Sequence, residues 1–180
     1  MKIEMGRPEN CEERLEKESR VYDCLDGLKI EYWRVDHEEA ATMEACEQVG
    51  KALDVLICKN LFLCNRQKTD FYLLLMPGDK PFKTKELSSQ IHSARLSFAP
   101  EEQMLEFLNI APGSVSVMGL MNDTDNRVKL LVDEDVFQGE YLGCHPCINT
   151  SSLKIRTKDV FEKFLPAVHH DWISVHLTGE

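Results

Sequence analysis

Two apolar runs that lie close together in the sequence constrain the fold of this chain most. The first, the apolar run from Val55 to Cys64, lies within DVLICKNLFLCN, residues 54–65, and the second, FYLLLMP, covers residues 71–77. The segment NRQKTD that separates them is short and polar. Apolar runs of this length are typical of buried strands, and a short polar connector joins antiparallel neighbours. We therefore predict a β-hairpin over residues 55–77.

Lys59 interrupts the first of these runs, and Asn60 follows it directly. Lysine is almost never fully buried without a partner, so its ammonium must reach solvent, pair with a counter-ion or meet a ligand. The segment around it, residues 51–95, holds 8 Lys and Arg against 4 Asp and Glu, an excess of +4. This excess could form a local phosphate-binding face, or it could simply be a solvated surface.

Helical spacing and capping residues occur on both sides of the hairpin. We predict a first helix over about residues 9–26 with Gly27 as its stop, and a second helix capped by Thr42. Further helices are expected to begin at Thr84, Pro100 and Thr157, the last of them ending at Pro166.

Alternating or continuous apolar patterns predict the remaining strands, which cover residues 29–37, 114–121, 127–135 and 153–155. The second and third of these are joined by the turn-forming run NDTDN and are expected to pair. Strand pairs joined by short turns, without regular βαβ alternation, favour an α+β fold. We expect a single domain over residues 1–180, with a mixed, largely antiparallel sheet flanked by helices.

Composition and charge exclude several classes of protein. No segment approaches the ~20 apolar residues that a membrane span needs, and the charged N-terminus is unlike a secretion signal. We therefore expect a cytoplasmic protein without a membrane partner, whose seven cysteines are reduced thiols. A net charge of −10 argues against indiscriminate nucleic-acid binding.

Two loops carry residues suited to binding a ligand. GCHPCINTSS begins with Gly143 and contains His145 in a run of turn-forming residues, which is typical of a binding rim as well as of an ordinary turn. Gly113 in APGSV can present backbone N–H groups to a carbonyl oxygen. Cys144 and Cys147 have the spacing of half a zinc site, but the sequence has no second pair. We expect no metal and no cofactor.

Four segments together resemble one known family: DHEEAATMEAC, CKNLFL, LSFAPEEQMLEFLNIAPGSVSVMGLMND and GCHPCINTSSL. Their order and spacing are similar to those of the YbaK-like superfamily of prolyl-tRNA synthetase editing domains, over roughly residues 20–170. The most similar branch is free-standing and deacylates alanyl-tRNA charged onto proline tRNA. The resemblance implies the α+β fold of that superfamily and a trans-editing hydrolase of alanyl-tRNA(Pro). Its partners would be the tRNA acceptor end and prolyl-tRNA synthetase.

The resemblance also implies the residues of the site. The essential lysine of the family falls on Lys59, and His37 matches the stretch that precedes the lysine strand. The implied substrate-binding residues are Thr42, Asn60, Gly113, Ser114, Ser116, Gly143 and His145. As an ammonium, Lys59 would hold a terminal phosphate or polarise the ester carbonyl. We favour this role over that of a neutral amine acting as a base.

Two other functions stay open from the sequence. The thiols of Cys144 and Cys147 fit a related deacylase acting on another mischarged tRNA, such as cysteinyl-tRNA(Pro). The same fold could also serve as a non-catalytic module that binds aminoacyl-tRNA or an amino acid. An aminoacyl ester is already reactive, so the absence of a recognisable Ser-His-Asp set is compatible with hydrolysis.

Overall fold

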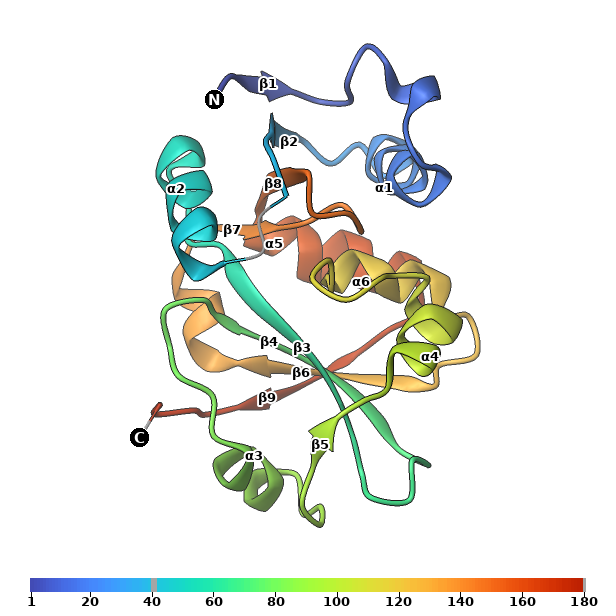
Figure 1. The fold of residues 1–180 in the computed structure, drawn as a ribbon, viewed down its shortest axis with the longest axis vertical. Helices are drawn as coiled ribbons and strands as arrows, with labels where there is room; N and C mark the ends of the chain where they lie inside the picture. Colours follow the sequence, from blue (N-terminus) through green and yellow to red (C-terminus); the bar gives the residue numbers. More distant parts are fainter. Residues whose placement is uncertain (40–41, 180) are drawn as a thin grey trace.

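The computed structural model describes residues 1–39 and 42–179 and arranges their strands in two sheets (Figure 1). The first sheet is antiparallel, with the order β1 (Ile3–Met5), β2 (Tyr32–Asp36), β8 (Ser151–Arg156) and β7 (Tyr141–Cys144). The second has the order β5 (Ser97–Phe98), β3 (Cys58–Cys64), β4 (Phe71–Pro77), β6 (Val128–Asp133) and β9 (Trp172–Val175). In it β4, β6 and β9 are parallel, and β3 is antiparallel to both neighbours. The predicted α+β class with mixed, largely antiparallel pairing is confirmed, with the strands divided between two sheets.

Helices pack around these two sheets, and several of them contribute side chains to the main core. They are α1 (Glu16–Gly27), α2 (Met43–Leu53), α3 (Thr84–Gln90), α4 (Glu101–Gln103), α5 (Thr157–Asp159) and α6 (Leu165–Ala167). Turns of π-helix follow α4 over Met104–Leu108 and α5 over Val160–Phe164, and turns of 3₁₀-helix cover Cys11–Glu13, Val117–Asn122 and Glu134–Gln138. Within the described residues, none of the helices has the length and apolar character needed to cross a membrane.

The predicted hairpin is confirmed as the pair β3–β4, which is buried on both faces. Phe62 and Cys64 of β3 belong to the main hydrophobic core, which also contains side chains of the other sheet. Leu63, one residue out of phase, belongs to a second core that α3 covers. This alternation follows from the period of two along a strand. Burying both faces explains why the two runs are almost continuously apolar.

Segment 114–121 was predicted as a strand, and this prediction is wrong. Ser116 accepts a hydrogen bond from the N–H of Met118, and a 3₁₀-helix begins there in place of a strand. Four successive residues, from Val117 to Leu120, are buried, so the burial pattern does not alternate. Strand β6 therefore has no hairpin partner before it and pairs in parallel with β4 instead.

Several predicted helix ends also differ from the structure. The N-terminal helix begins at Glu16, not near residue 9, and includes Gly27. Lys83 and Arg156, in extended conformation, occupy the N-cap positions predicted for Thr84 and Thr157, each of which is the first helical residue. Thr157 instead donates its hydroxyl to the carbonyl of Gly139. Side-chain capping is a local preference, and here the tertiary contact overrides it.

Pro166 lies inside α6 and does not end the last helix as predicted. Proline lacks an N–H group, and its ring crowds the carbonyl four residues earlier in a regular helix. The turn of π-helix that precedes α6 is wider than an α-helical turn. We infer that this wider turn accommodates the proline ring.

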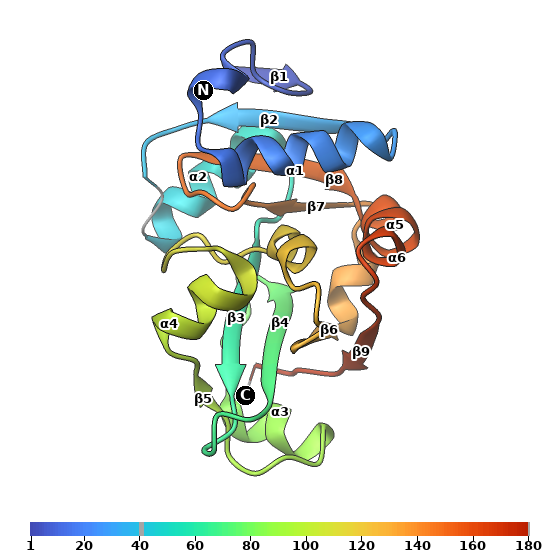
Figure 2. The same cartoon turned by 90° about the vertical axis from the view of Figure 1, so that its right-hand side faces the viewer.

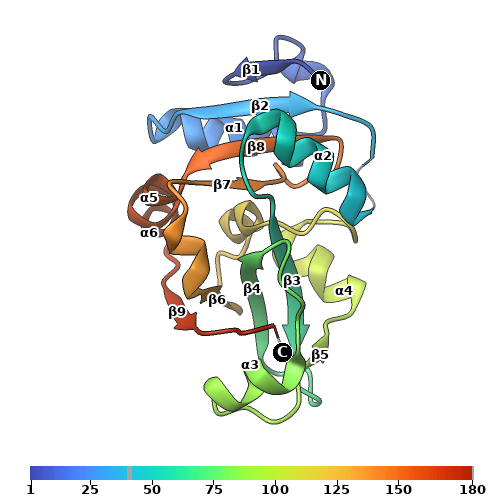
Figure 3. The same cartoon turned by 90° about the vertical axis from the view of Figure 1, so that its left-hand side faces the viewer.

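The molecule has one side formed by β3, β5, α2 and α4 and an opposite side formed by α5, α6 and β9. Figures 2 and 3 show this division from two opposite directions. On the first side, β3 has β4 along one edge, while β5 covers its other edge only at Leu63 and Cys64. The start of β3, with Lys59 and Asn60, therefore lies at a partly open edge of the sheet.

Candidate functional site

An open cleft of about 590 Å³ lies where segments far apart in the sequence meet. The end of β2 contributes Asp36, the predicted glycine loop contributes Ser114, and the predicted histidine loop contributes Asn149. Arg14, from the segment ahead of α1, lines another wall. The structure thus brings the two predicted binding loops to one place.

A network of charged hydrogen bonds fixes one wall of the cleft. Arg14 donates to the two carboxylate oxygens of Asp36 at 3.0 and 2.8 Å, and Arg34 and Ser151 donate to the same carboxylate. Burial alone would raise the pKa of Asp36, but these hydrogen bonds outweigh it and hold the pKa below its usual value. Arg14 also pairs with Glu18, so its charge is balanced by protein carboxylates.

His145 is buried in the loop whose residues Ile148, Asn149 and Thr150 line the cleft, and it is held by a defined set of partners. Its Nδ1 lies 3.0 Å from the carbonyl oxygen of Ser151, so Nδ1 carries the proton and donates it. Burial lowers the pKa of His145, and the nearby His37 lowers it further, against the opposing effect of the Ser151 carbonyl. The imidazole is therefore neutral at pH 7, with a lone pair on Nε2. Within the described residues Nε2 has no hydrogen-bond partner.

His37 is brought to His145 as the sequence predicts for one site. The two ring centroids are 6.3 Å apart, and Nε2 of His37 lies 2.9 Å from the Ser152 hydroxyl. That hydroxyl is also 3.3 Å from Nδ1 of His145. The hydroxyl of Ser152 therefore links the two rings, and both rings are held by residues of β8.

The glycine loop combines an exposed backbone turn with buried serines. Gly113 has φ +86°, a left-handed conformation that favours glycine, and a side chain there would approach Nδ2 of Asn149 to 3.5 Å. Ser114 is nearly buried but lines the cleft. Ser116 is fully buried, caps the following 3₁₀-helix and hydrogen-bonds the sulfur of Cys144. Ser116 therefore supports the loop from beneath.

Gly143 allows a close approach between the two sheets. It forms an isolated bridge with Ile57, just before β3, and its N–H donates to the carbonyl of Leu56. A Cβ at position 143 would lie 2.5 Å from Cδ1 of Ile57 and 3.1 Å from Cγ1 of Val55. Gly143 thus joins the histidine loop to the lysine strand through backbone contact.

The thiols around His145 are buried and free. Burial raises the pKa of Cys144 well above its usual range and raises the pKa values of Cys58 and Cys147 to about 12. All three are therefore protonated at neutral pH, a state unsuited to nucleophilic or redox chemistry. In the part of the chain that the structure describes, no group of three His, Cys, Asp or Glu side chains is placed to hold a metal ion.

Asn60 carries an unsatisfied polar atom toward this region. Its Nδ2 lies 3.4 Å from the carbonyl oxygen of Cys58, but its buried Oδ1 has no hydrogen-bond partner among the described residues. Asn60 shares the face of β3 that carries Cys58 and Phe62, which is the face toward the main core. Such a buried acceptor is costly to leave without a hydrogen-bond partner.

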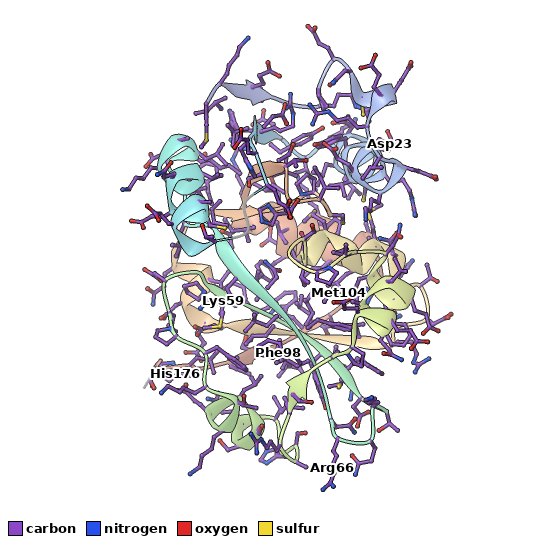
Figure 4. All side chains as sticks on the ribbon, viewed as in Figure 1. Asp23, Lys59, Arg66, Phe98, Met104 and His176 are labelled. Atoms are coloured by element: carbon purple, nitrogen blue, oxygen red, sulfur yellow. The ribbon has the colours of Figure 1, made fainter. Side chains whose placement is uncertain are left out.

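Lys59 points to the other face of β3, away from Asn60. It pairs in register with Met76 of the second core, and its ammonium donates to the carbonyl oxygen of Lys80 at 2.7 Å. Within the described residues no carboxylate pairs with this ammonium. The ammonium of Lys80, in contrast, is neutralised by Asp133 and Asp135, each at 2.6 Å. Figure 4 shows Lys59 near the α2 end of β3.

Thr42 caps α2, as the sequence predicts. Its hydroxyl accepts a hydrogen bond from the N–H of Ala45 at 3.1 Å. The residue is exposed and lies just after residues 40 and 41, which are outside the described part of the chain. The structure therefore gives Thr42 a role in starting the helix.

Comparison with known proteins identifies the family. The sequence model of the aminoacyl-tRNA editing domain matches residues 37–163, a range that contains both loops and the lysine strand. This chain belongs to the aminoacyl-tRNA editing domain family. The predicted resemblance is thus confirmed at the level of the family.

Individual relatives of this editing-domain protein extend over most of its length. The prolyl-tRNA editing protein ProX of Acetoanaerobium sticklandii is 28% identical over 163 residues, which cover 91% of this chain and 99% of ProX. Prolyl-tRNA synthetase associated domain-containing protein 1 of Danio rerio is 30% identical over 150 residues, which cover 82% of this chain and 80% of that protein. A solved structure described as a trans-editing enzyme for prolyl tRNA synthetase has a TM-score of 0.67 at 15% identity, covering 91% of this chain and 99% of that one. At this identity the likeness shows the shared fold.

Sequence reasoning did not single out three residues of the cleft wall. Asn149 belongs to a loop that was predicted to bind, and its place in a polar run was a usable signal. Asp36 and Arg14 gave no such signal, because their partners lie elsewhere in the sequence. Their contribution depends on the docking of the N-terminal segment against β2.

Proposed function

We propose that this chain, as a single editing domain, hydrolyses the ester bond of mischarged alanyl-tRNA(Pro). The observations that carry the proposal are the meeting of the two loops at one cleft and two acceptors, Oδ1 of Asn60 and Nε2 of His145, that have no partner among the described residues. These two acceptors suit a substrate that brings its own donors. An aminoacyl ester has an α-ammonium group and a free ribose hydroxyl, and both can donate.

Hydrolysis of such an ester needs positioning and charge stabilisation more than a strong nucleophile. Water adds to the carbonyl carbon, the bond from that carbon to the ribose oxygen breaks, and the ribose oxygen takes up a proton. The neutral imidazole of His145 is suited to accept a hydrogen bond from the attacking water or from the free ribose hydroxyl. The N–H of Gly113, in its left-handed turn, is suited to the developing oxyanion.

Lys59 supplies the positive charge in this proposal. Its ammonium has three N–H donors, and the Lys80 carbonyl uses one of them. Lys59 points to the face of β3 opposite to Asn60, but its partner is neutral, so its charge is not cancelled. We propose that the charge is available to a tRNA phosphate on that face or, around the open edge of β3, to the ester carbonyl. The opening at the edge of β3 gives an RNA backbone access to this position. We assign the catalytic role to Lys59 as an ammonium.

Selectivity for alanine over proline would come from size. A pocket that holds one methyl group excludes the pyrrolidine ring by direct overlap, whereas a missing methylene group provides only ~1–3 kcal/mol of discrimination. Prolyl-tRNA itself would therefore escape hydrolysis. The acceptor end of proline tRNA, alone or held by prolyl-tRNA synthetase, is the proposed partner.

The experiment that tests this proposal measures the release of labelled amino acid from tRNA(Pro) carrying alanine, cysteine or proline. We expect rapid hydrolysis of the alanyl ester and none of the prolyl ester. Preference for the cysteinyl ester would move the chain to the related deacylase, although the raised pKa values of Cys144 and Cys147 argue against a thiolate mechanism. Binding of all three substrates without hydrolysis would make the chain a non-catalytic module.

The proposed role of His145 predicts a particular dependence on pH. His145→Asn keeps a donor for the Ser151 carbonyl but removes the acceptor at the position of Nε2, and we expect a loss of about 100-fold in kcat. Because burial lowers the pKa of His145 from its ordinary value, the neutral form persists to lower pH than it does in a free imidazole. The ratio of wild-type to variant rates should thus fall only at a lower pH than the titration of a free imidazole would give.

The titration of the substrate ammonium affects the wild-type and variant rates equally, so it cancels in their ratio. Each rate is corrected for uncatalysed ester hydrolysis at the same pH. A ratio that already falls with the titration of a free imidazole, or at a higher pH, would contradict the role of a neutral His145.

A further inference from the structure

An exposed aromatic face lies along β3 beyond Lys59 and is separate from the cleft. Phe98 of β5 is 66% exposed, and its ring contacts the ring of Phe82 edge-on, with a centroid distance of 6.4 Å. Phe98 pairs with Leu63 across the two strands, so both side chains lie on the face of β3 that carries Leu61 and Lys59. In Figure 4, Lys59 and Phe98 lie along β3, with Lys59 toward α2 and Phe98 toward β5.

Unpaired basic residues flank Phe82 and Phe98 along the chain. Lys83 follows Phe82 directly, Lys85 lies in the first turn of α3, and Arg95 precedes β5. All three are exposed, and the ion pairs among the described residues involve none of them. A single exposed apolar residue is ordinary on a protein surface. An exposed ring flanked by unpaired cations, on a chain of net charge −10, calls for an anionic partner with flat apolar groups.

We infer that Phe98 is a stacking platform for a base in the unpaired 3′ end of the tRNA, and that Lys83, Lys85 and Arg95 contact its phosphates. This inference rests on the proposed function, because the aminoacyl ester must lie near Lys59. Proteins that bind single strands combine a basic groove with aromatic rings on which bases stack, and such stacking is tolerant of sequence. The occupant is therefore RNA, bound by its backbone and by one base.

The spacing along β3 fits this arrangement. Leu63, the partner of Phe98, is four positions after Lys59 along β3, which corresponds to about 13 Å at the usual rise of a strand. When the ester of the terminal adenosine lies at Lys59, the nucleotides that precede it extend along the strand toward β5. Phe98 would therefore stack on a base that precedes the terminal adenosine.

The test is the binding of uncharged tRNA(Pro) to the full chain, followed by fluorescence anisotropy. We expect Phe98→Ala and Phe98→Leu to weaken binding about 5- to 100-fold, the range found for loss of one base–aromatic stack. Phe98→Tyr, which keeps an aromatic ring, should bind like the wild type. A transcript that lacks its last three nucleotides should bind all of these proteins weakly and equally. Since Phe98 is exposed, the variants should unfold at nearly the same temperature as the wild type.

The basic residues have a separate signature in salt. Replacing Lys85 with glutamine should reduce the slope of log affinity against log salt concentration by about 0.7, the value for release of one counterion from a single strand. The matched control is Lys158→Gln, an exposed lysine of α5 on the opposite side of the molecule. It should leave the slope unchanged.

Three outcomes would overturn the inference. The first is that the wild type and Phe98→Ala bind tRNA(Pro) equally well. The second is that Phe98→Ala weakens binding of the truncated transcript as much as binding of the full transcript. The third is that Phe98→Ala loses binding to prolyl-tRNA synthetase while it retains RNA binding. The last would make the aromatic face a protein docking surface. Uncharged tRNA undergoes no hydrolysis, so this experiment is independent of the proposed activity. A chain that binds RNA through Phe98 but releases no amino acid would support this inference and contradict the proposed function.

Discussion

Replacement of Lys59 by alanine is expected to lower kcat/KM for alanyl-tRNA(Pro) about 100- to 1,000-fold. This is the range found when one preorganised group that stabilises charge in a transition state is removed. The ammonium of Lys59 has a neutral carbonyl as its partner, so its loss leaves no protein carboxylate unpaired. The effect should therefore appear in catalysis and not in folding. Release of labelled alanine under single-turnover conditions measures it directly.

Two further variants separate charge from position. Lys59→Arg keeps the charge but carries it on a planar, more extended group, and it should recover only part of the lost activity. Lys158→Ala removes an exposed lysine whose pairing with Glu162, at 3.9 Å, contributes little, and its activity should equal that of the wild type. Unchanged hydrolysis by Lys59→Ala would remove Lys59 from the reaction and leave the cleft residues as the whole site.

The sequence predicts correctly those strands whose own apolar pattern is strong enough to require burial. The run of β4 and the end of β3 are apolar on both faces, and the structure buries them on both faces. Segment 114–121 shows why a short alternation is insufficient. Val115 and Val117 alternate with serines, but Ser116 caps a 3₁₀-helix whose apolar side chains pack in or against the main core. Contacts with distant segments decide between a strand and a 3₁₀-helix at this position, and a local sequence pattern does not contain them.

The same reasoning separates the predictable part of the site from the rest. The two loops and Lys59 are marked in the sequence by residue type, and the structure brings the two loops together at the cleft. That Lys59 and Asn60 serve opposite faces of β3 follows from the period of a strand. The wall formed by Arg14 and Asp36 was not predictable, because 22 residues separate the two partners and their pairing requires the N-terminal segment to dock on β2.

Gly78→Ala is expected to destabilise the protein by about 3 kcal/mol, the upper part of the range for forcing extra volume into a packed site. A Cβ at position 78 would overlap the carbonyl oxygen of Ile57, a backbone atom that cannot turn away as a side chain can. For a chain of 180 residues this corresponds to a fall of roughly 10 °C in Tm. Thermal unfolding followed by circular dichroism measures it.

Gly27→Ala is the matched control, with an effect of opposite sign. A Cβ at Gly27, the last residue of α1, meets no atom within 4 Å, and alanine should stabilise the fold by roughly 0.5 kcal/mol. Equal Tm values for the two variants would contradict the close approach of Gly78 to Ile57. That approach also sets the start of β3, two residues before Lys59. Gly78→Ala should therefore lose hydrolytic activity even at temperatures where it remains folded, whereas Gly27→Ala should keep it.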